Sequence, residues 1–261
     1  MLYGTIFGDI AGSSYEFNPV KSDKFDLITS KSRFTDDTVM SLAVANWLMG
    51  DRKQDTLVKE MQYMGGRYPR AGFGGMFRKW LVSDNPVPYN SFGNGSAMRV
   101  SPCAWAATSL EEAEHLAKKS AIVTHNHSEG IKGAQAVAGA IYMARYGGTK
   151  EEIKAFVEHT FGYDLNRTIK EIKESGYDFD STCQGSVPEA IIAFLEGNSY
   201  EEVIRLAIYL GGDADTQAAI AGSIAEAFYE MPGRFIGDVE KRLDKYLLSV
   251  LNEFNNFVSN E

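Results

Sequence analysis

The chain has 261 residues, of which 44% are hydrophobic and 23% are charged; this composition is that of a globular protein and excludes a disordered, collagen-like or coiled-coil chain. Its 26 basic and 35 acidic residues give a net charge of −9, which argues against a broad nucleic-acid-binding surface. Only two cysteines occur, so a disulfide framework is excluded. The N-terminal segment does not resemble a signal peptide, and no apolar run has the length of a membrane span. We therefore expect a cytoplasmic monomer without a membrane segment.

Helical patterns dominate the sequence in chain order. Residues 40–48 carry apolar side chains at helical spacing. Three pairs have the spacing of a capping box, in which a helix follows the first member: Ser109 with Glu112, Thr149 with Glu152, and Ser199 with Glu202. Pro188 and Gly197 predict a helix that begins at the proline and ends at the glycine.

Two alanine- and glycine-rich stretches, 130–145 and 215–229, predict central helices, because small residues let helix axes approach closely. The best candidate for a strand is the short segment 25–29. Long linkers and repeats are absent from the sequence. We therefore expect residues 1–261 to form one all-α domain.

Two acidic clusters precede predicted helices and share a composition of two aspartates and one threonine. The first is Thr35-Asp36-Asp37 and the second is Asp213-Ala214-Asp215-Thr216. Helix capping explains either cluster alone, since Asp and Thr are favoured at helix starts. If the two helices are neighbours, four carboxylates converge, and two hard divalent cations such as Mg²⁺ or Mn²⁺ would neutralise them. Both interpretations remain open from these residues alone.

Five motifs in order resemble the ADP-ribosylglycohydrolase family, which includes dinitrogenase-reductase-activating glycohydrolases and ADP-ribosyl-acceptor hydrolases. The resemblance runs from near residue 4 to near residue 230. Its motifs are Gly8-Asp9 with Gly12 and Glu16-Phe17; residues 32–38 (SRFTDDT); 93–99 (GNGSAMR); 124–127 (THNH); and 211–216 (GGDADT). Any one motif is weak, whereas five at plausible separations are specific.

The resemblance implies an all-α orthogonal multi-helix bundle with a central binuclear site for two Mg²⁺ or Mn²⁺ ions. It implies six metal ligands: Thr35, Asp36, Asp37, Asp213, Asp215 and Thr216. It also implies hydrolysis of the bond between ADP-ribose and an acceptor, in which the metals engage the hydroxyls of the distal ribose and position a water. The resemblance thus implies that the protein binds a substrate that contains ADP-ribose, such as an ADP-ribosylated protein.

Glu16 and Asp37 are the candidate catalytic residues. From the sequence, Glu16 is either a surface residue after a helix or a group that faces the site beyond the small residues Ala11–Ser14. The resemblance implies that Glu16 contacts a metal, a water or the ribose, and an acid–base role suits glycosidic cleavage. We expect Asp9 to support the structure of the site without contacting the substrate.

Residues 90–96 are either an ordinary Asn-Gly turn or a loop that binds phosphate and nucleoside, because glycines permit close backbone approach. The resemblance favours the second interpretation, with these substrate-binding residues: Asn90, Ser91, Phe92, Gly93, Asn94, Gly95, Met98 and His125. His125 and His127 could instead cap the helix from Ser128. Arg99 is either a phosphate ligand or a buried structural cation.

The acceptor is left open by the sequence: arginine, serine, a nucleobase and a small molecule all fit. The alternative to an enzyme is a non-catalytic relative that binds ADP-ribose or serves as a crystallin-like structural protein. All six metal-ligand positions and Glu16 are present in this chain, which favours the enzyme. An HD-type phosphohydrolase is disfavoured, because no histidine is followed by aspartate.

Overall fold

The computed structural model describes residues 1–22 and 24–260, which are predominantly helical. The helices are α1 (Tyr3–Gly12), α2 (Asp36–Met49), α3 (Gln54–Arg67), α4 (Gly75–Leu81), α5 (Gly95–Met98), α6 (Ser101–Trp105), α7 (Leu110–Ile122), α8 (Ser128–Arg145), α9 (Lys150–Phe161), α10 (Ile169–Glu174), α11 (Cys183–Glu196), α12 (Tyr200–Leu210), α13 (Ala214–Phe228), α14 (Gly233–Arg242) and α15 (Lys245–Ser259). Within the described residues there is no β-strand, and Gly93 and Thr182 form an isolated antiparallel bridge. The predicted all-α class is confirmed.

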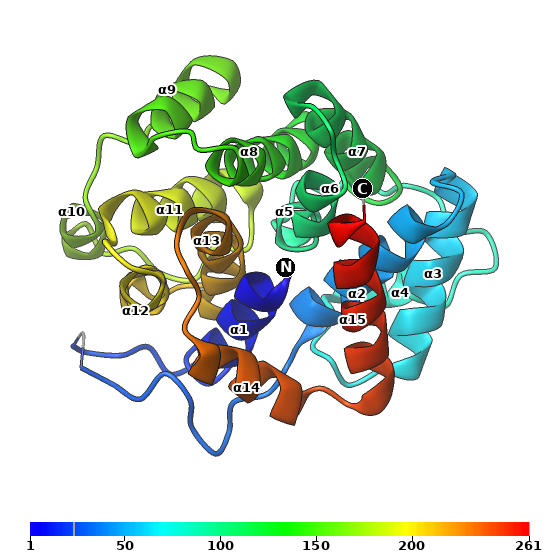
Figure 1. Cartoon of the computed structure of the whole chain (residues 1–261), viewed down its shortest axis with the longest axis horizontal. Helices are drawn as coiled ribbons and strands as arrows, with labels where there is room; N and C mark the ends of the chain where they lie inside the picture. The colour runs from blue at the N-terminus through cyan, green and yellow to red at the C-terminus, as the bar shows by residue number, and fades with distance from the viewer. Residues whose placement is uncertain (23, 261) are drawn as a thin grey trace.

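Helices α1 and α13 lie side by side near the centre of the bundle, and the other helices surround them in different directions (Figure 1). Helices α8, α11 and α12 pack on α13, while α2 packs against α3, α6 and α15. The two stretches predicted as central helices, 130–145 and 215–229, correspond to α8 and α13. Most of their small residues are buried.

The contact between α1 and α13 depends on glycines spaced four residues apart. A Cβ atom on Gly8 would lie 2.0 Å from the carbonyl oxygen of Ala218, and one on Gly12 would lie 2.4 Å from that of Ala214. Only glycine therefore lets these two backbones approach so closely. The consequence is that the C-terminal end of α1 lies against the first turn of α13.

Some predicted element boundaries are wrong. Pro188 lies inside α11, which begins at Cys183 with Thr182 as its N-cap, so the proline does not open the helix. Residues 25–29 form no strand. Two of their carbonyl groups bond instead to side chains: Phe25 O accepts from Arg205 and Asp26 O accepts from the Tyr15 hydroxyl.

All three predicted capping residues cap their helices, but only one of the three predicted capping boxes is complete. Thr149 and Glu152 form a complete capping box at α9. Ser109 and Ser199 cap α7 and α12. The carboxylates that follow these two serines do not return to the cap residue: Glu112 accepts from Thr108 and Glu202 from the amide of Asn198.

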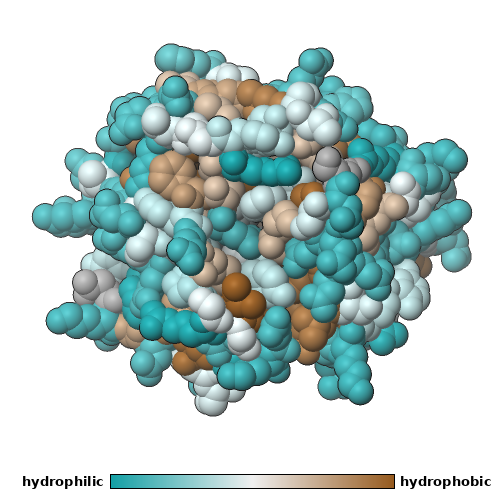
Figure 2. All heavy atoms as spheres, in the orientation of Figure 1, coloured by the Kyte–Doolittle hydropathy of each residue, from teal (hydrophilic) through white to brown (hydrophobic). Residues whose placement is uncertain are grey.

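Within the described part of the chain, no helix combines the length and the apolar character needed to cross a membrane. On the face drawn in Figure 2, hydrophilic residues cover most of the periphery, and hydrophobic residues appear in separate patches between them.

Candidate active site

Asp9 on α1 organises the start of α2. It accepts hydrogen bonds from the amide of Thr35 (2.9 Å), the hydroxyl of Thr35 (2.7 Å), the amide of Thr38 (3.1 Å) and the hydroxyl of Thr38. Burial raises the pKa of Asp9 to about 6, although these hydrogen bonds oppose the shift. Because both carboxylate oxygens are used in this way, Asp9 supports the site by holding the two threonines, as expected.

The acidic clusters at the starts of α2 and α13 converge, as the sequence predicted they would if these helices were neighbours. Carboxylate oxygens of Asp9, Asp37 and Asp215 lie within 4.8 Å of one another, and so do those of Glu16, Asp213 and Asp215. Asp215 belongs to both groups. The two groups together form a chain of acidic oxygens between α1, α2 and α13 that can bind metal.

One fully buried oxygen of this cluster lacks a hydrogen-bond partner among the described residues. The Oδ2 atom of Asp37 accepts from the Thr35 hydroxyl at 3.2 Å. The Oδ1 atom of Asp37 is buried and unpaired. A buried carboxylate oxygen without a donor is costly. An oxygen-ligated divalent cation would satisfy it, so this atom fits a metal ligand.

Burial raises the pKa of several of these carboxyl groups. The pKa of Asp37 and that of Asp215 lie well above the usual range, first because of burial and then because of neighbouring aspartates. The same two causes raise the pKa of Asp36 and that of Glu16 to about 7. Among the described residues, no lysine or arginine forms an ion pair with these carboxylates. The cluster therefore needs protons or cations.

A cavity of about 660 Å³ opens beside the acidic cluster. The predicted site residues that line it are Glu16, Thr35, Asp36, Asp37, Ser91, Gly93, Asn94, Gly95, Met98, His125, Asp213, Asp215 and Thr216. The predicted metal-binding and glycine-rich segments, distant in the sequence, thus share one cavity.

Two predicted substrate-binding residues are not among those that line the cavity. Asn90 has a left-handed backbone (φ 55°), and its amide donates to the side chain of Asn126. Phe92 is 45% exposed, and its ring centroid lies 5.3 Å from that of His127. Both residues are exposed, and their contacts with substrate remain predictions.

The loop that carries Gly93 and Asn94 is tied to the acidic cluster. The amide of Asn94 donates to Ser181 O at 2.8 Å. The side-chain Nδ2 of Asn94 donates to Asp213 at 2.8 Å and to Ser186 at 3.1 Å. Asn94 therefore links the loop both to the start of α11 and to a predicted metal ligand.

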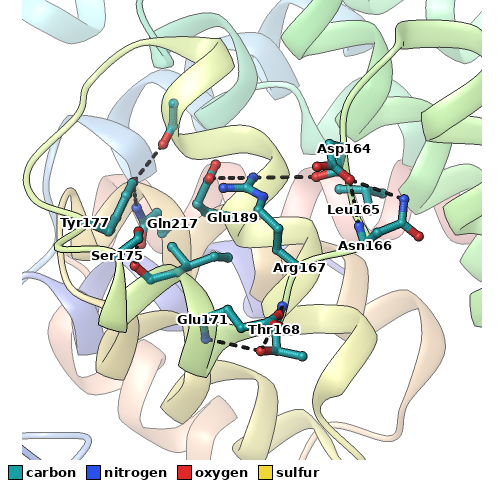
Figure 3. A network of polar contacts seen from close by, with 12 residues as sticks. Asp164, Leu165, Asn166, Arg167, Thr168, Glu171, Ser175, Tyr177, Glu189 and Gln217 are labelled. Atoms are coloured by element: carbon teal, nitrogen blue, oxygen red, sulfur yellow. Dashed lines mark hydrogen bonds and ion pairs between the residues drawn. The ribbon is translucent and has the colours of Figure 1, made fainter.

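A polar network holds the connection between α9 and α11 beside α13 (Figure 3). Arg167 pairs with the buried Glu189 at 2.8 Å. The Tyr177 hydroxyl donates to Gly185 O at 2.8 Å and accepts from the side chain of Gln217. This network fixes the connection at α11 and at the first turn of α13, near the loop that carries Asp213.

Several cavity residues were not predicted from the sequence: Phe17, Arg33, Ala71, Gly72, Gly74, Gly75, Met76, Phe77, Tyr89, Phe179 and Ser181. The rings of Phe17 and Phe179 stack with centroids 6.3 Å apart, and they are 77% and 48% exposed. Phe17 follows Glu16 directly and could have been inferred from that position. The glycines at 72, 74 and 75 were a further sequence signal for close approach, whereas nothing local marks Phe179.

The two histidines have different roles. The side chain of His127 accepts from the amide of Glu129 and caps α8, so the capping interpretation is correct for this residue. His125 is 5% exposed and lines the cavity.

The ADP-ribosylglycohydrolase family model matches residues 1–256. The chain is 27% identical to ADP-ribosylarginine hydrolase Tri1 of Pseudomonas putida, over 89% of this chain and 70% of that protein. It is also 27% identical to ADP-ribosylhydrolase ARH3 of Homo sapiens, over 88% of this chain and 84% of that protein. A solved ADP-ribosylglycohydrolase-related protein complex superposes with a TM-score of 0.71 at 25% identity, covering 95% of this chain and 93% of the other. On this match of sequence and fold, the chain belongs to the ADP-ribosylglycohydrolase family.

Proposed function

We propose that this protein hydrolyses the glycosidic bond between ADP-ribose and an acceptor, with two Mg²⁺ or Mn²⁺ ions as cofactors. The observation that carries the proposal is the convergence, in one cavity beside a glycine-rich loop, of Glu16 with carboxylates from the starts of α2 and α13. The names of the relatives, an ADP-ribosylarginine hydrolase and an ADP-ribosylhydrolase, support this reaction. The intact acidic cluster favours an enzyme over a non-catalytic ADP-ribose binder or a crystallin-like protein.

The cations would be held by Thr35, Asp36, Asp37, Asp213, Asp215 and Thr216, all of which line the cavity. Carboxylate and hydroxyl oxygens are hard ligands, which suits Mg²⁺ and Mn²⁺. When bound, the cations supply the positive charge that offsets the aspartates and orients substrate oxygens. The unpaired Oδ1 of Asp37 supports its inclusion in the ligand set.

Glu16 is the side chain that we propose for proton transfer. Its pKa is raised to about 7 by burial and by the charge of Asp213, so near neutral pH the group can both hold and release a proton. A general acid or base works best when its pKa lies near the working pH. Glu16 lines the cavity together with the exposed Phe17 and Phe179, and we assign this part of the cavity to the acceptor.

The function is tested by incubating the protein with ADP-ribosyl-arginine, ADP-ribosyl-serine and ADP-ribose-1″-phosphate, each with Mg²⁺, with Mn²⁺ and with chelator. We expect release of ADP-ribose from at least one substrate, and its loss in chelator. ADP-ribose binding without turnover of any substrate would favour the non-catalytic alternative. Turnover that is unaffected by chelation would contradict the proposed cofactors.

The metal-free protein should lose stability as the pH rises. The raised pKa of Asp36 and that of Glu16, both about 7, mean that the folded state binds protons more tightly than the unfolded chain does. Their stabilising contribution is complete below the unfolded pKa of about 4 and is lost as the pH rises through about 7. In chelator, we therefore expect the Tm to be higher at about pH 5.5 than at about pH 8.

Mg²⁺ should raise the Tm more at the higher pH, because the carboxylates are then ionised and available to the cation. Differential scanning fluorimetry across this pH range, with and without Mg²⁺, measures both effects. The test variant is Asp37→Asn, which removes one titratable carboxyl group from the cluster and should flatten the pH dependence of the Tm. A Mg²⁺-induced rise in Tm that shrinks with increasing pH would contradict this prediction.

A further inference from the structure

Arg99 is a buried cation without a carboxylate partner among the described residues. It directly follows α5 and is 1% exposed. Its guanidinium donates to three oxygens: Gly95 O at 3.1 Å, Ser120 O at 2.8 Å and Thr124 Oγ1 at 2.9 Å. Burial lowers its pKa to about 10, so the group stays charged at neutral pH. Arg99 therefore places a positive charge beneath the glycine-rich loop, next to the cavity that it also lines.

Thr124 connects this cation to His125. The Oγ1 atom of Thr124 must accept from Arg99, because a guanidinium has only donors. The same oxygen lies 2.7 Å from Nδ1 of His125, so the threonine can donate its own proton to that nitrogen. The carbonyl of Thr124 accepts from the amides of Tyr89 and Ser91, and these bonds hold the threonine in place.

The opposite edge of the His125 ring faces the glycine-rich loop. The Nε2 atom lies 3.3 Å from the position that a Cβ of Gly95 would occupy, and 3.6 Å from that of Gly93. Within the described residues Nε2 has no hydrogen-bond partner, and His125 lines the cavity. Burial, and then the charge of Arg99, hold the pKa of His125 well below its usual range. The ring is therefore neutral and carries one proton.

We propose that Arg99, acting through the hydroxyl of Thr124, holds His125 in the tautomer that carries its proton on Nε2. In that tautomer His125, which the family resemblance already implies as a substrate-binding residue, can donate a hydrogen bond to a phosphate oxygen at Gly93–Gly95. Arg99 and Thr124 are positioning residues, and His125 is the residue that contacts the ligand. The opposite tautomer would present a lone pair to the anion and repel it. The choice of a phosphate of ADP-ribose rests on the proposed function, whereas the tautomer does not.

The tautomer is measured directly by long-range ¹H–¹⁵N NMR on protein labelled with ¹⁵N-histidine. The chain has four histidines, and the His125 signals are assigned by their absence from His125→Gln. We expect a neutral ring protonated at Nε2 in the ligand-free wild type. A ring protonated at Nδ1, or a charged ring at neutral pH, would overturn the proposal. This measurement needs no substitution within the Arg99–Thr124 pair.

The positioning role is tested with Thr124→Val, which removes the hydroxyl at nearly constant volume, and with Thr124→Ser, which keeps it. In Thr124→Val we expect a population protonated at Nδ1 and about tenfold weaker ADP-ribose binding by calorimetry, since hydrogen bonds to charged groups have about this value. Thr124→Ser should restore both the tautomer and the affinity. An unchanged tautomer and affinity in Thr124→Val would overturn the positioning role. A wild type with the Nε2–H tautomer that binds no ADP-ribose would instead contradict the proposed function.

Discussion

Asp215→Ala and Asp36→Ala should each lower kcat by about 1,000-fold or more, because a missing ligand disturbs both the position and the charge of the cations. Asp215 is expected to have the larger effect, since it belongs to both groups of converging carboxylates. Steady-state kinetics at saturating Mg²⁺ or Mn²⁺, together with calorimetric titration of the metal, measure the loss of turnover and of binding.

The same variants should not be destabilised in chelator. Removing one of several crowded buried anions relieves repulsion and desolvation, so the Tm should stay the same or rise. Asp238→Ala is the matched control: this aspartate pairs with Arg242 on α14 and does not line the cavity, so its kcat should equal that of the wild type. Near-wild-type turnover of Asp215→Ala, with the metal still bound, would refute the ligand assignment.

Glu16→Gln should lower kcat by about 100-fold or more, the scale of general acid–base catalysis, while ADP-ribose binding is mostly retained. Glutamine preserves the size of the side chain and removes both its charge and its ability to transfer a proton. A loss confined to kcat indicates an interaction made in the transition state and not in the ground state. Steady-state kinetics and calorimetric titration of ADP-ribose on the same preparation distinguish a loss of kcat from a loss of binding.

Asp26→Asn provides the control for Glu16→Gln. It removes one negative charge from the same connection between α1 and α2, at an exposed position outside the cavity. Its kcat and its affinity for ADP-ribose should match those of the wild type. If Glu16→Gln instead weakened ADP-ribose binding and left kcat unchanged, Glu16 would be a binding residue and not the proton-transfer group.

Local patterns in the sequence were sufficient to predict the helical class and many helix starts. Thr35, Ser109, Thr149 and Ser199 all act as N-caps, because a cap depends on a hydroxyl and an amide only two or three residues apart. The failure at Pro188 has a related cause: proline is favoured in a first turn, but Thr182 already provides the cap of α11 and the proline is accommodated inside the helix.

The residues of the acidic clusters were also evident from the sequence, whereas their geometry was not. Adjacent residues in a helix point about 100° apart, as 3.6 residues per turn requires. Asp37 therefore joins the group with Asp9 and Asp215, while Asp36, its neighbour, does not. Which carboxylate faces which depends on how α1, α2 and α13 pack, and that packing is set by backbone contacts such as Gly8 against Ala218.

The sequence alone predicted candidate oxygen ligands at two helix starts and a glycine-rich loop between them, and its motifs indicated the family to which the chain belongs. Only the tertiary structure decided which side chains line the cavity. It excluded Phe92 from the lining and brought in Phe179 and Arg33. The reason is physical: capping and turn formation act over a few neighbouring residues, whereas a cavity is lined by side chains that packing brings together from distant segments, and no local pattern encodes their approach.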